Sequence, residues 1–249
     1  MPAKKLFDIR QGVRLGSDVF IVPKEYVQKL RKSEQKFFRP AVMNTSIVGA
    51  RLNDKYYAFY PYSAGKLDIS TEQELQDRVP TYFNDFLLAA KTKLSSRRSL
   101  GGDLKWWELL RHRSWQEEHG PKIVSKYFGG SRSFAFDRAG QFVVVVGNAW
   151  LVRRGAVNLA ITDEEIYFAA LTYLSSAIAD GLLKYVSIQV SGGQLDLSNK
   201  YIGSLLVPNL AKVDASKVSA LVQTGKLISE GQIDDWNDVD GLVLSILNG

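Results

Sequence analysis

The chain has 249 residues, 45% of them hydrophobic and 23% charged, so it holds enough apolar material for the core of one large or two small domains. It contains no cysteine, which excludes disulfide bonds, thiolate nucleophiles and cysteine-ligated zinc. The formal net charge is +6, and no apolar run approaches the roughly 20 residues that a membrane-spanning helix needs.

The positive charge is concentrated in two blocks. Residues 1–60 carry 12 Lys and Arg against 5 Asp and Glu, a net +7, and residues 91–138 carry 11 against 5, a net +6. The other segments are each slightly negative. Two basic blocks separated by neutral or acidic chain favour a one-sided electrostatic field and a polyanionic partner, with scattered surface lysine as the alternative.

The first half of the chain predicts short strands and helices in alternation. An apolar strand at 20–22 precedes a polar amphipathic helix over 24–36, and the aromatic stretch 55–62 favours a second strand. Thr71 opens a Thr-x-x-Glu capping box, and a longer helix is expected to start near Pro80, which suits a first-turn position.

The second half changes first to strands and then to helices. Four apolar runs predict strands, and the turn at 137–140 between two of them predicts a meander: 121–124, 133–136, 141–146 and 149–152. A helix is expected from Thr162 to about Ala179. The last forty residues predict two helices, 215–229 and 239–247, joined by an acidic linker.

No constellation of catalytic residues is evident. His112 and His119 are seven residues apart, whereas a zinc-protease helix needs two histidines four apart. No Gly-x-Ser-x-Gly motif or phosphate-binding loop occurs. Glu34 and Lys36 match half of a common nuclease metal site, with Asp18 as a further ligand, but they fall on a predicted solvated helix where that site wants a strand.

Binding features are richer than catalytic ones. The stretch Lys105–Trp115 holds three of the five tryptophans beside Arg111 and Arg113, residue types that stack on rings and contact bases or phosphates. One tryptophan of the pair 106–107 is expected in the core instead. A protein-binding role for the cluster is a further alternative.

Two neighbouring segments add basic residues. Lys122 and Lys126 can share one face of a strand with Val124, and we expect Lys122 and Arg113 on the surface. The loop 11–17 places an arginine between two glycines, which would let its backbone approach a ligand closely.

Six stretches follow one another in a recognisable order: 9–22, Arg39-Pro40, 94–97, 106–109, Pro121-Lys122-Ile123, and 173–176 with the loop 192–194. Their order resembles the TaqI-like C-terminal specificity domain, the target-recognition domain of adenine-N6 DNA methyltransferases and of fused restriction–modification enzymes. The resemblance covers roughly residues 6–210. Leu15 replaces a threonine usual in that family, and Ser175-Ser176 replaces Asn-Ser.

The mixture of predicted strands and helices indicates an irregular α+β fold, and with the resemblance it predicts a mixed β-sheet recognition domain with flanking helices over 1–210. The helical segment 211–249, being acidic, is expected to dock a partner instead of DNA. Phe59-Tyr60-Pro61-Tyr62 lacks the polar residue of the family's catalytic motif, and no glycine-rich cofactor loop is present. We therefore expect a non-catalytic subunit that needs no cofactor. The start MPAKK favours a natural stand-alone subunit over an excised domain.

The expected function is sequence-specific binding of double-stranded DNA together with a separate adenine-N6 methyltransferase subunit, in a cytoplasmic restriction–modification or phage-defence system. A metal-dependent nuclease and a protein-interaction module without DNA binding are the alternatives. The residues expected to contact DNA are Arg14, Ser17, Arg97, Arg98, Lys105, Trp107, Arg111, Arg113, Lys122, Ser125, Lys126, Arg132 and Gln194.

Overall fold

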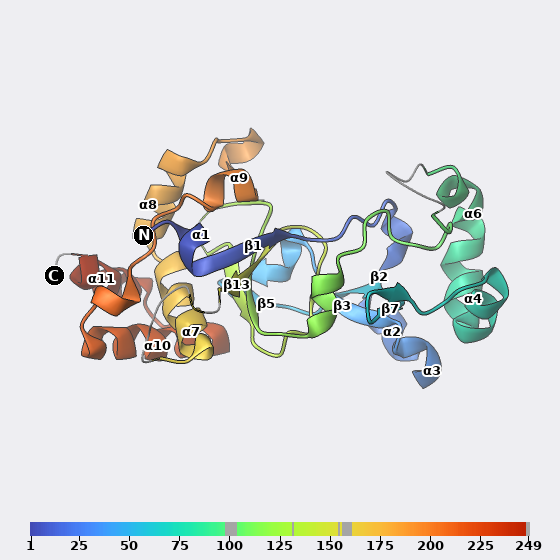
Figure 1. Cartoon of the computed structure of the whole chain (residues 1–249), viewed down its shortest axis with the longest axis horizontal. Helices are drawn as coiled ribbons and strands as arrows, with labels where there is room; N and C mark the ends of the chain where they lie inside the picture. Colours follow the sequence, from blue (N-terminus) through green and yellow to red (C-terminus); the bar gives the residue numbers. More distant parts are fainter. Residues whose placement is uncertain (98–103, 131, 154, 156–160, 248–249) are drawn as a thin grey trace.

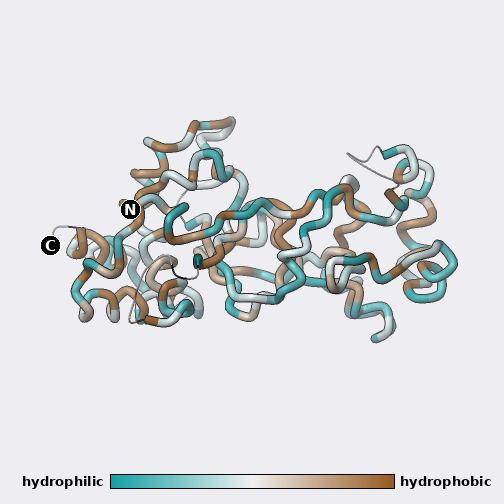
Figure 2. The backbone as a smooth tube through the Cα atoms, in the orientation of Figure 1, coloured by the Kyte–Doolittle hydropathy of each residue, from teal (hydrophilic) through white to brown (hydrophobic). Residues whose placement is uncertain are grey.

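The computed structural model describes residues 1–249 except 98–103, 131, 154, 156–160 and 248–249. The fold is α+β, as the sequence predicts. The molecule is elongated, with the helices of the C-terminal third at one end, those of residues 24–95 at the other, and the sheets between them (Figure 1). Figure 2 shows hydrophobic segments at both ends, because each end has its own core.

A four-stranded antiparallel sheet lies at the centre. Its order is β1-β13-β9-β11, so the first strand of the chain pairs with one from its middle. Ile9 lies opposite Trp150, and Ile123 lies opposite both Trp150 and Phe136, which aligns the apolar side chains on one face. The strands are β1 (Phe7–Gln11), β9 (Lys122–Ser125), β11 (Phe134–Asp137) and β13 (Asn148–Val152).

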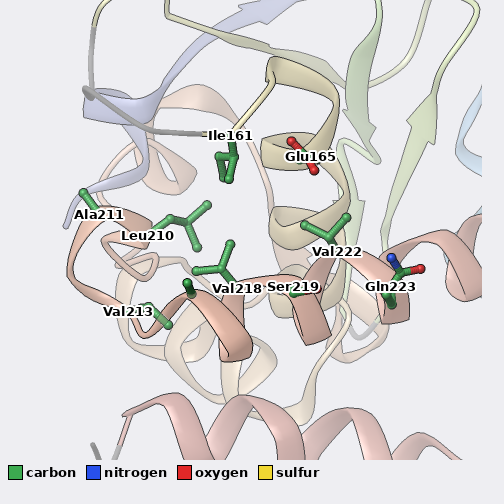
Figure 3. A pocket seen from close by; sticks show the side chains of 10 residues that line it. Ile161, Glu165, Leu210, Ala211, Val213, Val218, Ser219, Val222 and Gln223 are labelled. Atoms are coloured by element: carbon green, nitrogen blue, oxygen red, sulfur yellow. The ribbon is translucent and has the colours of Figure 1, made fainter.

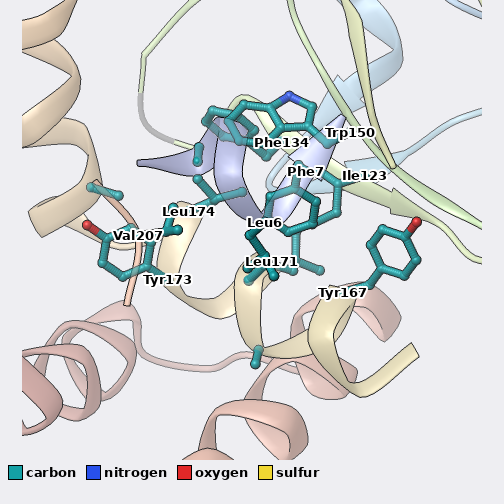
Figure 4. Packing of buried hydrophobic residues seen from close by; sticks show 14 of the residues in the cluster. Leu6, Phe7, Ile123, Phe134, Trp150, Tyr167, Leu171, Tyr173, Leu174 and Val207 are labelled. Atoms are coloured by element: carbon teal, nitrogen blue, oxygen red, sulfur yellow. The ribbon is translucent and has the colours of Figure 1, made fainter. Parts of the chain in front are cut away.

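Helix α7 (Asp163–Leu174) covers that face of the sheet. Thr162 caps its start by a reciprocal pair of hydrogen bonds with Glu165, as the acidic first turn predicts. Figure 4 shows Phe7 and Trp150 facing Leu171 of the helix across the core. The rings of Phe7 and Trp150 meet edge to face at 5.6 Å within the sheet, and the ring of Phe136 lies 5.1 Å from that of Tyr167 and 5.0 Å from that of Phe168, which joins the sheet to the helix.

The C-terminal helices complete the same core. Helix α10 (Ala215–Glu230) packs against α7 so closely that a Cβ atom at Gly225 would lie 2.1 Å from the carbonyl oxygen of Phe168. Helix α11 (Trp236–Leu247) contributes Val239 and Val243. Both match the helices predicted from the sequence, and α11 begins three residues earlier than expected. The boundary at residue 210 stays a prediction.

A second sheet, ordered β12-β3-β6-β2, forms the other half of the molecule. Its neighbours are antiparallel except for the parallel pair β12–β3. The aromatic side chains of this sheet bury themselves against helices, with Phe38 and Phe59 against Tyr82 at 4.9 Å each. The strands are β2 (Ile21–Pro23), β3 (Phe38–Val42), β6 (Tyr56–Phe59) and β12 (Val143–Val144).

Helical segments enclose this second core. Thr71 accepts a hydrogen bond from the Glu74 amide at the start of α4, and Pro80 occupies the first turn of α5, both as predicted. The segments are α2 (Lys24–Lys29), α3 (Lys32–Gln35), α4 (Glu72–Arg78), α5 (Pro80–Tyr82), the π-helical η3 (Phe83–Leu87) and α6 (Leu88–Ser95).

Short elements connect these layers. They are α1 (Ala3–Leu6), η1 (Asp18–Phe20), η2 (Asn44–Ser46), β4 (Ile47–Val48), β5 (Arg51–Leu52), β7 (Tyr62–Ser63), β8 (Lys66–Leu67), η4 (Ser114–Glu118), β10 (Phe128–Gly129), α8 (Ala177–Val186), η5 (Ser191–Gly193), β14 (Leu195–Asp196), α9 (Asn199–Ile202) and η6 (Leu210–Lys212).

Three sequence predictions are wrong in detail. The helix over 24–36 is broken at Leu30, whose ψ of 158° is extended. The helix from Thr162 ends at Leu174, because the side chain of Ser176 caps a new helix, α8, bent by 79° from α7. The four strands do not form a meander: β12 leaves for the second sheet, and β13 inserts between β1 and β9.

Candidate nucleic-acid interface

The two basic blocks of the sequence meet at one short ladder. The amide of Arg14 donates to the carbonyl oxygen of Arg111 at 3.0 Å, and the amide of Arg111 donates back to Arg14 at 2.9 Å. The amide of Leu110 donates to Leu15 at 3.2 Å. Both arginine side chains are exposed. Residues almost one hundred positions apart therefore present their charges side by side.

Arg113 is the third member of this group. Its Nε atom lies 3.4 Å from the carbonyl oxygen of Gly12, which holds the side chain across the loop. Burial lowers the pKa of Arg113 most, and the charges of Arg111 and Arg14 lower it further. Among the described residues, none of the three forms an ion pair with a carboxylate. We call Arg14, Arg111 and Arg113 the arginine cluster.

The glycines of the same loop serve the protein's own packing. A Cβ atom at Gly12 would lie 2.3 Å from the carbonyl oxygen of Val144, and one at Gly16 would lie 2.8 Å from a guanidinium nitrogen of Arg97. The expectation that these glycines let a ligand approach is therefore wrong. Gly12 lets β12 approach the loop, and Gly16 lets the Arg97 side chain approach it. Ser17 accepts a hydrogen bond from the Val19 amide at the start of η1.

Arg97 is an internal brace. Its guanidinium donates to four backbone carbonyls, those of Leu94, Leu15, Trp106 and Glu108, at 2.7 to 3.1 Å. This side chain ties the end of α6 to the loop of Arg14 and to the segment that leads to Arg111. It is half-buried with its donors engaged by the protein itself, and its contact with DNA stays a prediction. Arg98 lies outside the described residues.

The tryptophans are packing residues in this structure. Trp107 is 5% exposed and donates from its ring nitrogen to the carbonyl oxygen of Ile69 at 3.1 Å. Trp106 is also buried and donates to Glu72 at 3.2 Å. Lys105 lies over the Trp107 ring and donates to the carbonyl oxygen of Ser70. The sequence predicted one of these two rings in the core, but both are buried. The expectation of a ring available for stacking is therefore wrong for Trp106 and for Trp107.

Lys122 and Ser125 are also internal. Lys122 is 3% exposed, and its Nζ atom lies 2.6 Å from Oδ2 of Asp137, which is equally buried. Burial lowers the pKa of Lys122, against the opposing effect of Asp137. Ser125 is fully buried and accepts a hydrogen bond from Trp150. The prediction that Lys122 lies on the surface is wrong, because Asp137 directly opposite on β11 neutralises it within the sheet.

The remaining predicted contact residues are Lys126, Arg132 and Gln194. Lys126 follows β9 and is partly exposed. The guanidinium of Arg132 lies 4.0 Å from the ring centroid of Trp236 in α11. Gln194 is exposed beyond the turn at Gly192.

A two-stranded projection follows α8, and we call residues 187–196 the finger. The amide of Val190 donates to Gln194 at 2.7 Å, that of Asp196 donates to Ile188 at 3.0 Å, and Gln189 pairs with Leu195. The sequence suggested only an apolar segment and a glycine loop here, because Ile188 and Val190 match a buried strand. The alternation of Gln189 with its apolar neighbours was the signal for a ribbon.

The acidic residues of the nuclease alternative do not converge. Glu34 is fully buried and accepts hydrogen bonds from the Thr81 and Tyr82 amides and from the Thr81 hydroxyl. It therefore caps the start of α5, which corrects the expectation of a solvated helix face. Asp18 and Lys36 are exposed on other elements. Within the described ranges, no cluster of three His, Asp or Glu side chains could hold a metal ion.

His112 lies between Arg111 and Arg113 in the chain and is partly buried. Its ring stacks on Tyr62 with centroids 4.1 Å apart, and its Nε2 atom lies 2.6 Å from Glu117. The other carboxylate oxygen of Glu117 accepts from the Gly65 amide at 2.6 Å. Burial lowers the pKa of His112 despite Glu117. This packing holds the segment that carries Arg111 and Arg113 against the turn between β7 and β8.

Two hollows lie elsewhere. One of about 370 Å³ opens between α7 and α10 and is lined mainly by aliphatic side chains such as Ile161, Leu210 and Val218, with Glu165 at its edge (Figure 3). Another, of about 530 Å³, is lined by both signs of charge, including Asp8, Arg10 and Arg153. No predicted DNA contact lines either hollow, so neither belongs to the arginine cluster.

No protein-family model matches the chain, and no curated protein matches it in sequence. Several solved structures share its fold, and two of them are restriction enzymes. The type IIL restriction–modification enzyme MmeI, determined in complex with DNA, matches 100% of this chain and 33% of its own, with 12% identity and a TM-score of 0.64. The type IIG restriction endonuclease BpuSI matches 99% of this chain and 31% of its own, with 14% identity and a TM-score of 0.57.

The chain thus has the fold of one part of two restriction–modification enzymes and spans about a third of the length of each. At these identities the likeness establishes the fold alone. In the described part of the chain, no single helix is long and apolar enough to cross a membrane, and α7 with α8 meets that measure only as a bent pair.

Proposed function

We propose that this chain is the DNA target-recognition component of a restriction–modification or phage-defence system and acts with a separate adenine-N6 methyltransferase. The arginine cluster carries the proposal, because it joins two basic sequence blocks into one group of like charges in which Arg14 and Arg111 are exposed and Arg113 is partly exposed. Like charges held together repel one another, and phosphates relieve that repulsion. The fold shared with MmeI, whose structure includes DNA, adds support.

In this proposal the chain binds DNA and recognises its sequence, and the partner subunit methylates the adenine. Arg14 and Arg111 contact phosphates and set the register of the duplex, while other side chains contact base edges. The methyl donor binds the partner, and the target adenine flips into the partner's pocket. The chain itself is then non-catalytic and needs no cofactor. The acidic segment 211–249 docks the methyltransferase, since it carries 6 Asp and Glu against 3 Lys.

Salt dependence of DNA binding tests the proposal. The parent should bind duplex DNA with an affinity that falls steeply as salt increases, with a log–log slope of about −0.9 for each neutralised phosphate. Arg14→Ala/Arg111→Ala should flatten that slope by roughly 1.8 if each arginine contacts one phosphate. Fluorescence anisotropy with a labelled duplex measures both quantities. Arg31→Ala is the matched control, because Arg31 is an exposed arginine in the break between α2 and α3.

Unchanged slope and affinity in the double variant would reject the arginine cluster as the DNA contact. A parent that binds no duplex would favour the protein-interaction alternative. Purification of the tagged chain from its host should recover an adenine-N6 methyltransferase. Mapping of N6-methyladenine in genomic DNA should then show one motif that disappears when this chain is deleted. If the motif persists, the chain does not direct that methyltransferase.

A further inference from the structure

The finger, residues 187–196, combines a rigid base with an exposed tip. At the base, Leu195 and Leu197 are buried, and β14 pairs with β10. The amide of Leu197 donates to the carbonyl oxygen of Tyr127 at 2.8 Å, and the side chain of Asn148 donates to Leu197 at 2.7 Å. The base is therefore fixed to the central sheet.

The tip is uncharged and narrow. Residues 188–194 contain no charged side chain, and Gly192 and Gly193 both have a positive φ, 75° and 74°. No heavy atom lies within 4 Å of a Cβ built at Gly192. The side-chain nitrogen Nε2 of Gln189 lies 3.5 Å from the position that a Cβ atom would take at Gly193, so this side chain lies alongside the turn. Gln194 is exposed on the opposite strand.

Large apolar side chains just before the finger and within its first strand are left exposed. Tyr185, near the end of α8, is 88% exposed, and Ile188 is 51% exposed. Exposed apolar side chains gathered around a projection mark a contact surface. Figure 1 shows α8 and α9, the helices that flank the finger in sequence, on the side of the molecule away from α10 and α11. Lys184, which forms a 3.4 Å ion pair with Asp180 on α8, and Lys200 on α9 are exposed lysines of the helices before and after the finger.

Resting on the function proposed above, we infer that the finger enters the major groove of duplex DNA and that Gln189 and Gln194 recognise adenine there. The major groove admits a two-stranded ribbon, and a glutamine amide can pair with N6 and N7 of adenine through two hydrogen bonds. Glycine at the turn keeps the tip free of side chains that would stop it at the groove wall. Tyr185 and Ile188 pack against sugar and thymine methyl groups. The lysines contact the flanking phosphates.

Selectivity and affinity then come from different parts of the molecule. The arginine cluster supplies charge that every DNA sequence satisfies equally. The finger offers amides, whose hydrogen bonds depend on which base is present. Removal of a glutamine should therefore change the preferred sequence more than the strength of nonspecific binding.

Selection from a randomised duplex pool, followed by sequencing, tests this role. The parent should select a motif that contains adenine at one or two fixed positions. Gln189→Ala and Gln194→Ala should each lose a preference for adenine of about 5- to 150-fold at one position, with nonspecific affinity retained. Gln189→Glu or Gln194→Glu should shift that position toward cytosine, whose N4 amino group donates to a carboxylate. Gln232→Ala, an exposed glutamine just after α10, is the control.

Several outcomes overturn the inference while the proposed function stands. One is a parent motif that persists unchanged in all glutamine variants. Another is weaker binding of every sequence to the same extent, which would make the finger a phosphate contact. A third is a Tyr185→Ser variant that keeps the parent's DNA affinity and motif but no longer recovers a protein partner. If the parent binds no duplex at all, the proposed function fails first and the inference fails with it.

Discussion

Two kinds of cation occupy the basic blocks of this chain, and they differ in what neutralises them. Lys122 and Arg97 are satisfied internally, the lysine by Asp137 at 2.6 Å and the arginine by four carbonyl groups. The arginine cluster has only Gly12 and solvent as neighbours for its donors in the described structure. A net charge counted from the sequence therefore overstates the positive charge that is available to a binding partner, because some of the cations are neutralised inside the fold.

Substitution of Lys122 should have the largest effect on the free energy of unfolding. Lys122→Ala leaves the Asp137 carboxylate buried and without its cation, so we expect a loss of about 3–5 kcal/mol in the free energy of unfolding. Urea denaturation followed by circular dichroism measures this loss. Lys126→Ala, four residues along and partly exposed, should stay within about 0.5 kcal/mol of the parent. Equal effects in both variants would contradict the internal role of Lys122.

Arg97→Ala should have the next largest effect. It removes a guanidinium that joins four carbonyl groups from three chain segments, and we expect a loss of about 2–4 kcal/mol in stability. Arg97→Lys should recover only part of it, because an ammonium cannot reproduce the planar fork. Thermal unfolding should give the highest midpoint temperature for the parent, a lower one for Arg97→Lys and the lowest for Arg97→Ala. A fully stable Arg97→Ala variant with weaker DNA binding would instead make Arg97 a DNA contact.

Trp107→Phe should be milder. The substitution keeps an aromatic ring in the core but leaves the Ile69 carbonyl without its donor, which should cost about 1–3 kcal/mol. Its affinity for duplex DNA, measured by anisotropy below the unfolding transition, should equal that of the parent. A stable variant with reduced affinity would restore Trp107 as a stacking residue.

The smallest expected effect is a dependence of stability on pH. Burial lowers the pKa of both His112 and His119, so between their folded values and the ordinary value of about 6.5 the unfolded chain binds more protons. Stability should therefore decrease as pH falls below about 6.5 and be fully present above it. His112→Phe keeps a ring on Tyr62 and should flatten this dependence in denaturation curves at pH 5 to 7. An unchanged slope would show that His112 does not contribute.

Local sequence patterns predicted several elements because their causes are local. The capping of α4 by Thr71, the first-turn position of Pro80 and the start of α7 after Thr162 each depend on residues within one helical turn. The strand pairing could not be predicted in the same way. The insertion of β13 between β1 and β9 joins residues more than one hundred positions apart, and no local pattern specifies that choice.

The candidate site shows the same division. Composition alone identified two basic blocks, and the ladder between Arg14 and Arg111 shows that they touch. The strand pattern also placed Lys122 on one face of a strand with Val124, but it could not show that Asp137 lies opposite. It likewise missed Gln189, because Ile188 and Val190 on either side match a buried strand, and only the structure shows that Ile188 is 51% exposed.

The sequence by itself determined the element types, the absence of cysteine chemistry and the excess of positive charge, since these depend on composition and on interactions within a turn or a strand. Only the tertiary structure decided which cations are neutralised internally and which remain for a partner. That distinction depends on the distance between side chains far apart in the chain, and Coulomb and desolvation energies change steeply with that distance and with burial.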